Sequence, residues 1–168
     1  MKPVRSLHPL LLEPSYWRTR ALALGQHRAG IIWTPRPDLG APGVEVSEFR
    51  LRTLNGGHLR GLFARSAWRR EHLAARIRTV GPASRLEIHE EEVRSGSAEF
   101  VLQEPAGRQL ADRVLDVVLL SQLAAETDGI DSVEVDNRWD HGGSDAAVIA
   151  QQLLQDRIVS PSADDPLL

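Results

Sequence analysis

The stretch from residue 130 to residue 154 constrains the fold of this chain more than any other part of the sequence. Residues 133–136 have the character of a short β-strand, Gly142 and Gly143 form a tight turn before Ser144, and a helical pattern opens at Asp145. Small residues around a serine at a strand-to-helix junction are typical of a nucleophile elbow, in which a sharp turn exposes the hydroxyl above a sheet. Glycine and serine also favour ordinary turns and helix N-caps, so a structural turn is the competing interpretation.

Composition indicates one globular domain. The chain has 168 residues, of which 42% are hydrophobic and 26% charged, as expected for a folded domain with a real core. The longest apolar runs, residues 117–120 and 146–150, are too short to cross a bilayer. The apolar residues 10–12 are followed by Glu13 and Pro14, too early for a secretory signal. We therefore expect a cytoplasmic protein without membrane contact.

Charge and cysteine content exclude further classes. The absence of cysteine rules out disulfides and thiolate catalysis. The formal net charge is −3, and arginines are spread among acids rather than clustered. Such a distribution argues against a nucleic-acid partner.

Residues 1–43 are expected to form an N-terminal extension. A helix is predicted around residues 15–24, with Ser15 as its cap and Gly25 as its stop, and Trp17 and Leu24 on one buried face. Residues 33–43, rich in proline and glycine, are predicted to be a connector without regular structure. A domain over residues 44–156 and a flexible tail over 157–168 complete the expected organisation.

The central region alternates between strand and helix patterns. Period-two alternation from Val44, the turn Asn55-Gly56-Gly57 and the returning run to Phe63 predict a β-hairpin. Strands are predicted at residues 75–80 and 98–103, with a weak helix over 84–94 between them. The strongest helical pattern covers residues 110–126, with Asp112, Arg113 and Asp116 mostly on its solvent side. This order predicts an α/β fold with a mixed, mostly parallel sheet of about five strands and helices on both faces.

The order of these segments resembles the N-terminal half of the α/β-hydrolase fold, and more narrowly acetyl xylan esterase-like hydrolases. The resemblance covers about residues 44–154. It is carried by the segments 49–61 (FRLRTLNGGHLRG), 100–108 (FVLQEPAGR), 112–116 (DRVLD), 135–139 (VDNRW) and 142–147 (GGSDAA). It implies a serine ester hydrolase with Ser144 as nucleophile and the backbone N–H of Asp145 as oxyanion donor.

The sequence departs from that family where catalysis needs it. No histidine follows Ser144, although such enzymes place their base after the nucleophile. Val80-Gly81-Pro82 stands where a His-Gly pair is expected, and a proline has no N–H to donate to an oxyanion. His141 lies only three residues from Ser144 across a tight turn, which is a poor geometry for a base. Asp140 also fits the elbow of aspartate-nucleophile hydrolases, but Arg138 occupies a position that this motif reserves for a small residue.

Other candidate sites have simpler interpretations. His89, among the acids of residues 87–92, fits a solvated polar face better than a metal cluster. The four tryptophans are scattered, which is typical of packing residues rather than of a sugar platform. Gly142-Gly143 has no lysine partner for a phosphate loop. We expect neither a cofactor nor a metal.

Two functional hypotheses remain. The first is a truncated, catalytically degenerate α/β-hydrolase-like protein that acts as a binding or assembly module, or is a remnant. Its sheet would end in an exposed parallel edge, which predicts a homodimer or a protein partner. The second is an active serine carboxylesterase that uses Ser144 and a base supplied from elsewhere.

Overall fold

The computed structural model describes residues 13–27, 30–54, 56–136 and 145–159. Within them the sequence forms six strands, four α-helices and a short 3-10 helix. In chain order these are α1 (Pro14–Gln26), β1 (Ile32–Pro35), η2 (Pro37–Leu39), β2 (Val44–Arg52), β3 (His58–Ser66), β4 (Leu73–Val80), α2 (Glu90–Arg94), β5 (Ser97–Gln103), α3 (Leu110–Ala125), β6 (Ile130–Val135) and α4 (Asp145–Gln155). None of the described helices is both long and apolar enough to span a bilayer.

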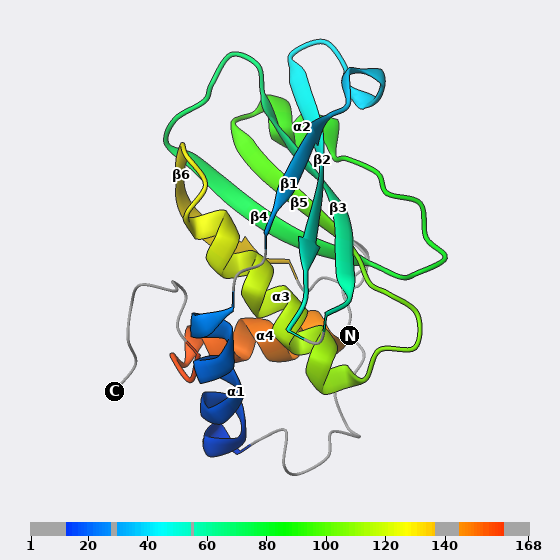
Figure 1. The fold of residues 1–168 in the computed structure, drawn as a ribbon. Helices are drawn as coiled ribbons and strands as arrows, with labels where there is room; N and C mark the ends of the chain where they lie inside the picture. Colours follow the sequence, from blue (N-terminus) through cyan, green and yellow to red (C-terminus); the bar gives the residue numbers. More distant parts are fainter. Residues whose placement is uncertain (1–12, 28–29, 55, 137–144, 160–168) are drawn as a thin grey trace.

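The strands form one sheet in the order β1-β2-β3-β5-β4-β6 (Figure 1). β1, β2, β3 and β5 pair antiparallel in turn, whereas β4 runs parallel to both of its neighbours, β5 and β6. The chain therefore starts as an antiparallel meander and continues as parallel βαβ units, in which helices connect the strands. This confirms the predicted mixed sheet, whose parallel part is formed by β5, β4 and β6; three of the five strand pairings are antiparallel, and the sheet has six strands where about five were predicted.

Helices cover both faces of this sheet. On one face α3 contacts α1, α4, β4 and β6 and encloses the larger core, which includes Trp17, Phe49, Phe100 and Val135 (Figure 1). On the other face the short α2 packs Val93 against a smaller cluster that includes Val46, Leu62 and Ala64. Two separate apolar clusters on opposite faces are the signature of a three-layer α/β arrangement.

The hairpin between β2 and β3 forms as the sequence predicts. Arg52 pairs with His58 across its end, and the Thr53 N–H donates to the Gly57 carbonyl oxygen at 2.8 Å. Gly56 has φ +82°, a backbone conformation that glycine adopts without steric cost. The composition of the turn is thus explained by its backbone geometry.

The N-terminal region differs from the prediction. Residues 33–35, predicted to belong to a connector without regular structure, are part of strand β1, which pairs with β2. Pro35 is tolerated because β1 is an edge strand, where a missing N–H costs no ladder hydrogen bond. Trp33 remains 39% exposed on this strand.

The ends of α1 also differ from the prediction. The N-cap is Glu13 rather than Ser15, with Pro14 in the first turn where proline fits best, and Gly25 lies inside the helix. The face prediction is confirmed, since Trp17 and Leu24 are both buried.

Candidate functional site

The carboxyl ends of the parallel strands lie at the same end of the sheet and define the candidate site. β4, β5 and β6 end at Val80, Gln103 and Val135. Beyond these ends the Glu104 N–H donates to the Val80 oxygen at 2.9 Å, and the Asp136 N–H donates to the Ile77 oxygen at 2.7 Å. In open α/β sheets ligands bind outside the carboxyl ends of the strands, so a ligand-binding or catalytic site is expected at this end of the sheet.

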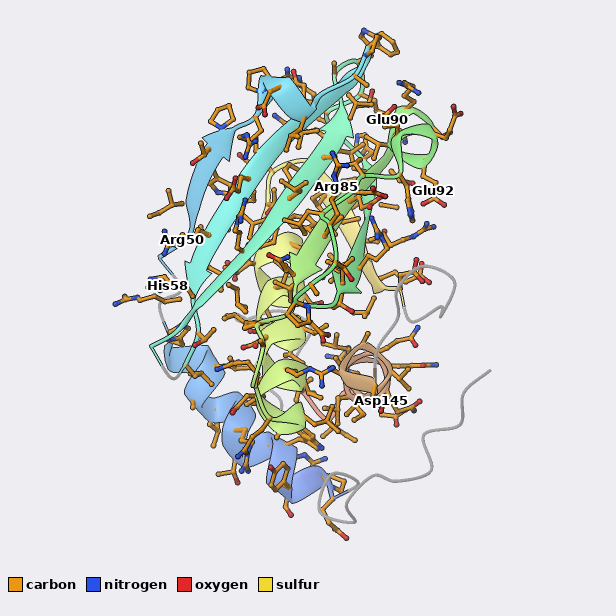
Figure 2. The ribbon with its side chains drawn as sticks, turned by 90° about the vertical axis from the view of Figure 1, so that its right-hand side faces the viewer. Arg50, His58, Arg85, Glu90, Glu92 and Asp145 are labelled. Atoms are coloured by element: carbon orange, nitrogen blue, oxygen red, sulfur yellow. The ribbon has the colours of Figure 1, made fainter. Side chains whose placement is uncertain are left out.

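In the sequence, the predicted elbow falls between the end of β6 and the start of α4. Ser144, Asp140 and His141 are outside the described residues, so their roles stay predictions. Asp145 is the first residue of α4, and Figure 2 shows α4 and α1 on opposite sides of α3. The N-terminus of a helix carries a partial positive charge that favours an oxyanion.

The two alanines after the predicted nucleophile have a packing role. Ala146 and Ala147 are fully buried against the main core. A larger side chain at either position would need space that the core does not offer. Part of the small-residue pattern around Ser144 is therefore required by packing alone.

Hydrogen bonds fix the turn that follows β4. The Ser84 N–H donates to the Gly81 oxygen at 3.0 Å, and the Gln103 Nε2 donates to the oxygens of Pro82 (3.3 Å) and Ser84 (3.1 Å). Gln103 at the end of β5 thus ties down the segment in which family members are expected to supply an oxyanion donor.

Two ion pairs at the end of β5 and the start of α3 were missed by the sequence reasoning. Buried Glu104 accepts from Arg113 at 2.8 Å, which ties the strand end to the helix. Arg108 binds Asp116 through two hydrogen bonds of 2.6 and 3.1 Å. The charged residues lie nine and eight positions apart, with no helical periodicity that would have revealed the pairs.

Asp116 is the perturbed carboxyl of this region. It was predicted on the solvent side of its helix but is only 4% exposed, which corrects that prediction. Burial raises the pKa of Asp116 to about 6, while the hydrogen bonds from Arg108 act in the opposite direction. A carboxyl that titrates near neutral pH beside a guanidinium is a feature of functional sites as well as of structural ion pairs.

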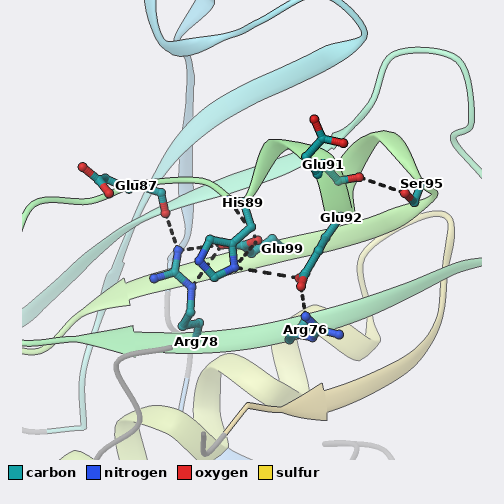
Figure 3. Close-up of polar contacts among 8 residues, drawn as sticks. All are labelled: Arg76, Arg78, Glu87, His89, Glu91, Glu92, Ser95 and Glu99. Atoms are coloured by element: carbon teal, nitrogen blue, oxygen red, sulfur yellow. Dashed lines mark hydrogen bonds and ion pairs between the residues drawn. The ribbon is translucent and has the colours of Figure 1, made fainter. Parts of the chain in front are cut away.

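A polar cluster on the opposite face surrounds His89 (Figure 3). The Nδ1 atom of His89 lies 3.8 Å from a carboxylate oxygen of Glu92 and 3.9 Å from one of Glu99. Glu99 is a buried residue of β5 that was not among the candidates predicted from the sequence. One imidazole and two carboxylates are a donor set that a divalent metal accepts. Here Arg76 binds Glu92 and Arg78 binds Glu99, so a cation would enter against two guanidinium charges. The cluster is an ion-pair network that fastens α2 to the sheet.

The sheet order, the parallel half and the helix-covered faces define an α/β protein of the open-sheet class. The sequence matches no protein-family model and no curated protein. Among solved structures it is similar to the acetyl xylan esterase from Paenibacillus sp. R4, with a TM-score of 0.60 and 11% identity over 80% of this chain and 53% of that one. It is also similar to acetyl xylan esterase 1 from Thermoanaerobacterium sp. JW/SL YS485, with a TM-score of 0.58 and 16% identity over 73% of this chain and 49% of that one.

These likenesses show the fold alone: over the matched part, the chain has an α/β-hydrolase-like fold. It spans about half the length of the two esterase structures. The predicted resemblance is confirmed at the level of the fold.

Proposed function

We propose that this chain acts as a binding and assembly module, whose sheet takes up an extended strand from a partner polypeptide along β6. The observation that supports this proposal is that β6 is an edge strand of the sheet among the described residues. β6 pairs with β4 on one side and, among the described residues, with no strand on the other. An exposed edge is a template for another strand, since its backbone donors and acceptors have no partner.

The direction of the backbone groups identifies the residues that would pair. The Asp136 N–H donates to Ile77 of β4, and backbone groups of a strand alternate in direction from one residue to the next. The N–H groups of Val133 and Val135 therefore point away from β4, toward an added strand.

A groove runs beside this edge. A cavity of about 580 Å³ is lined by β6 together with residues of α3 and α4, among them Ala125, Gln151 and Leu154. Val133 and Val135 form part of its apolar wall, so alternate side chains of an added strand would be buried there.

Charge favours a basic partner over a second copy of the chain. Asp131 and Glu134 on β6 are both exposed. Two copies paired through this strand would bring four carboxylates into one short ladder, which is unfavourable. A strand that alternates lysine with β-branched residues would place its lysines beside Glu134 and its apolar side chains in the groove.

Val133→Pro tests the edge because it removes one outward N–H and leaves the ladder to β4 in place. The probe is an acetylated, amidated peptide of sequence Lys-Val-Lys-Val-Thr-Val. We expect it to slow hydrogen exchange of the Val133 and Val135 amides in the wild-type protein. Val133→Pro is expected to weaken peptide binding about 10-fold or more, whereas Val133→Thr, which keeps the N–H and the β-branched shape, should weaken it much less.

Two results would contradict this proposal. One is equal binding of the peptide by Val133→Pro and Val133→Thr. The other is a stable dimer of the free protein in size-exclusion chromatography with light scattering, which would make a second copy the occupant of the edge.

A second candidate function is serine ester hydrolysis, favoured by the strand-to-helix junction between β6 and α4. In this case Ser144 is the nucleophile, the Asp145 N–H stabilises the oxyanion, and the base comes from another segment or subunit. Ser144→Ala is expected to lower hydrolysis of p-nitrophenyl acetate at least ~100-fold. Ser132→Ala, which alters an exposed serine of β6, is the control. Hydrolysis that is absent from the wild type, or unchanged in Ser144→Ala, would remove this candidate.

A further inference from the structure

A second cavity, independent of the β6 groove, lies between α1 and α3 beside the β2–β3 hairpin turn. Its volume is about 290 Å³. Leu24, Leu54 and Leu119 contribute apolar walls, and the charged side chains that line it are Arg20, Arg108, Asp112 and Asp116. An apolar space with a few converging polar groups is the usual form of a small-molecule site, and this volume suits a molecule smaller than a drug.

The Arg108–Asp116 pair is buried at this cavity. The two side chains are 17% and 6% exposed. Arg108 uses Nε and Nη2 to bind Asp116, so its remaining donor nitrogen, Nη1, is the one available to a further acceptor. A guanidinium held in this way is already oriented for a planar anion.

Arg20 supplies a second positive charge from α1. Its guanidinium lies over the Tyr16 ring at 3.5 Å and donates to the Tyr16 carbonyl oxygen at 3.3 Å. Among the ion pairs of the described residues, none joins Arg20 to a carboxylate. The direct contacts of its guanidinium are thus the Tyr16 ring and the Tyr16 carbonyl oxygen.

We propose that this cavity binds a small aliphatic carboxylate. The head group lies between the guanidinium groups of Arg20 and Arg108, and the hydrocarbon chain lies against Leu24, Leu54 and Leu119. Paired guanidiniums match the geometry of a carboxylate, and the apolar walls select for a short chain.

Binding of this anion is linked to protonation of Asp116. The charged groups that face Asp116 are Arg108, Asp112 and Glu104, and Arg20 shares the cavity. Because the pKa of Asp116 is raised to about 6, this carboxyl gains its proton as the pH falls from 7.5 to 5.5. Arg108 then loses its anionic partner, and the cavity becomes more positive by one charge. The carboxylate ligand stays ionised at pH 5.5, since an unperturbed carboxyl group such as that of a glutamate side chain has a pKa of ~4.3.

The experiment is a titration of the whole 168-residue chain with sodium butyrate, followed by amide shifts in heteronuclear NMR. We expect binding at pH 5.5 that is about 10-fold tighter than at pH 7.5. Asp116→Asn should bind butyrate at pH 7.5 as the wild type does at pH 5.5, because it cannot hold the negative charge. Arg20→Gln should weaken binding about 10-fold at both pH values. Arg18→Gln, on the exposed side of the same helix, is the matched control and should leave the affinity unchanged.

The controls separate this site from a non-specific effect of charge. Butyramide, which lacks the negative charge, should not shift the cavity residues. The proposal is overturned if the wild type binds no butyrate at pH 5.5, if Arg20→Gln and Arg18→Gln behave alike, or if affinity does not change with pH. The comparison of Arg20→Gln with Arg18→Gln and the pH dependence of the wild type test the proposal even if Asp116→Asn fails to fold.

Discussion

Replacing Gly61 with alanine is expected to destabilise the protein by about 3 kcal/mol or more, among the largest effects of any single methyl group in this chain. Gly61 lies in β3 opposite Phe49 of β2 and Leu102 of β5. A Cβ at this position would lie 2.2 Å from the Val101 carbonyl oxygen and 2.4 Å from the Phe49 ring. Since the oxygen belongs to the sheet backbone, the clash cannot be relieved by rotating a side chain.

Urea unfolding followed by circular dichroism measures this effect, and Gly57→Ala is the matched control. Gly57 lies in the same hairpin, where an added Cβ would meet only the Thr53 hydroxyl at 3.4 Å. We expect Gly57→Ala to change the free energy of unfolding by less than ~1 kcal/mol. Equal stability of the two variants would show that β3 and β5 are not packed as described.

The second large effect is expected from Arg78→Met, which leaves Glu99 buried without its cation. The Arg78 and Glu99 side chains are 6% and 2% exposed and lie 2.7 Å apart. Removing one partner of a buried ion pair costs about 3–5 kcal/mol, because the remaining charge loses its main counterion at a site that is shielded from water. The loss should appear in the same urea unfolding measurement.

A double variant distinguishes the cost of leaving a charge unpaired from the cost of losing the packing of the Arg78 side chain. Arg78→Met with Glu99→Gln carries no buried charge and keeps an acceptor for the His89 N–H, which donates to Glu99 at 3.3 Å. We expect the double variant to be more stable than Arg78→Met alone. Arg85→Met, at an exposed arginine in the loop before α2, should change little. A double variant no more stable than the single one would mean that packing of the arginine chain, not charge, explains the loss.

Helix α3 and the β2–β3 hairpin were predicted from regular patterns in the sequence. α3 begins at Leu110 as predicted, since Val114, Val117 and Val118 recur at helical spacing on a buried face. The β2–β3 hairpin follows from alternating apolar residues and a glycine turn. Strand β1 was missed because four residues ending in proline have no such signal, and only pairing with β2 makes them a strand.

The candidate site was predicted only in part. The elbow was predicted from the order of strand, glycines, serine and helix; the strand and the helix are present as β6 and α4, while the glycines and Ser144 lie outside the described residues and their role stays a prediction. The Arg108–Asp116 and Arg78–Glu99 pairs could not be predicted, because each joins residues that share no local period. Asp116 in particular is a residue type typical of the solvent side of a helix, yet it is buried, at a cavity that residues of α1 and the β2–β3 turn also line.

By itself, the amino-acid sequence determined the type and order of most strands and helices, because hydrophobic period, glycine turns and helix-forming residues act over a few neighbours along the chain. Tertiary structure alone decided that β5 inserts between β3 and β4, that β6 forms an edge, and that charged residues become buried pairs. These features depend on which segments meet in space. Their energies come from desolvation and strand pairing between residues far apart in sequence, so no local pattern records them.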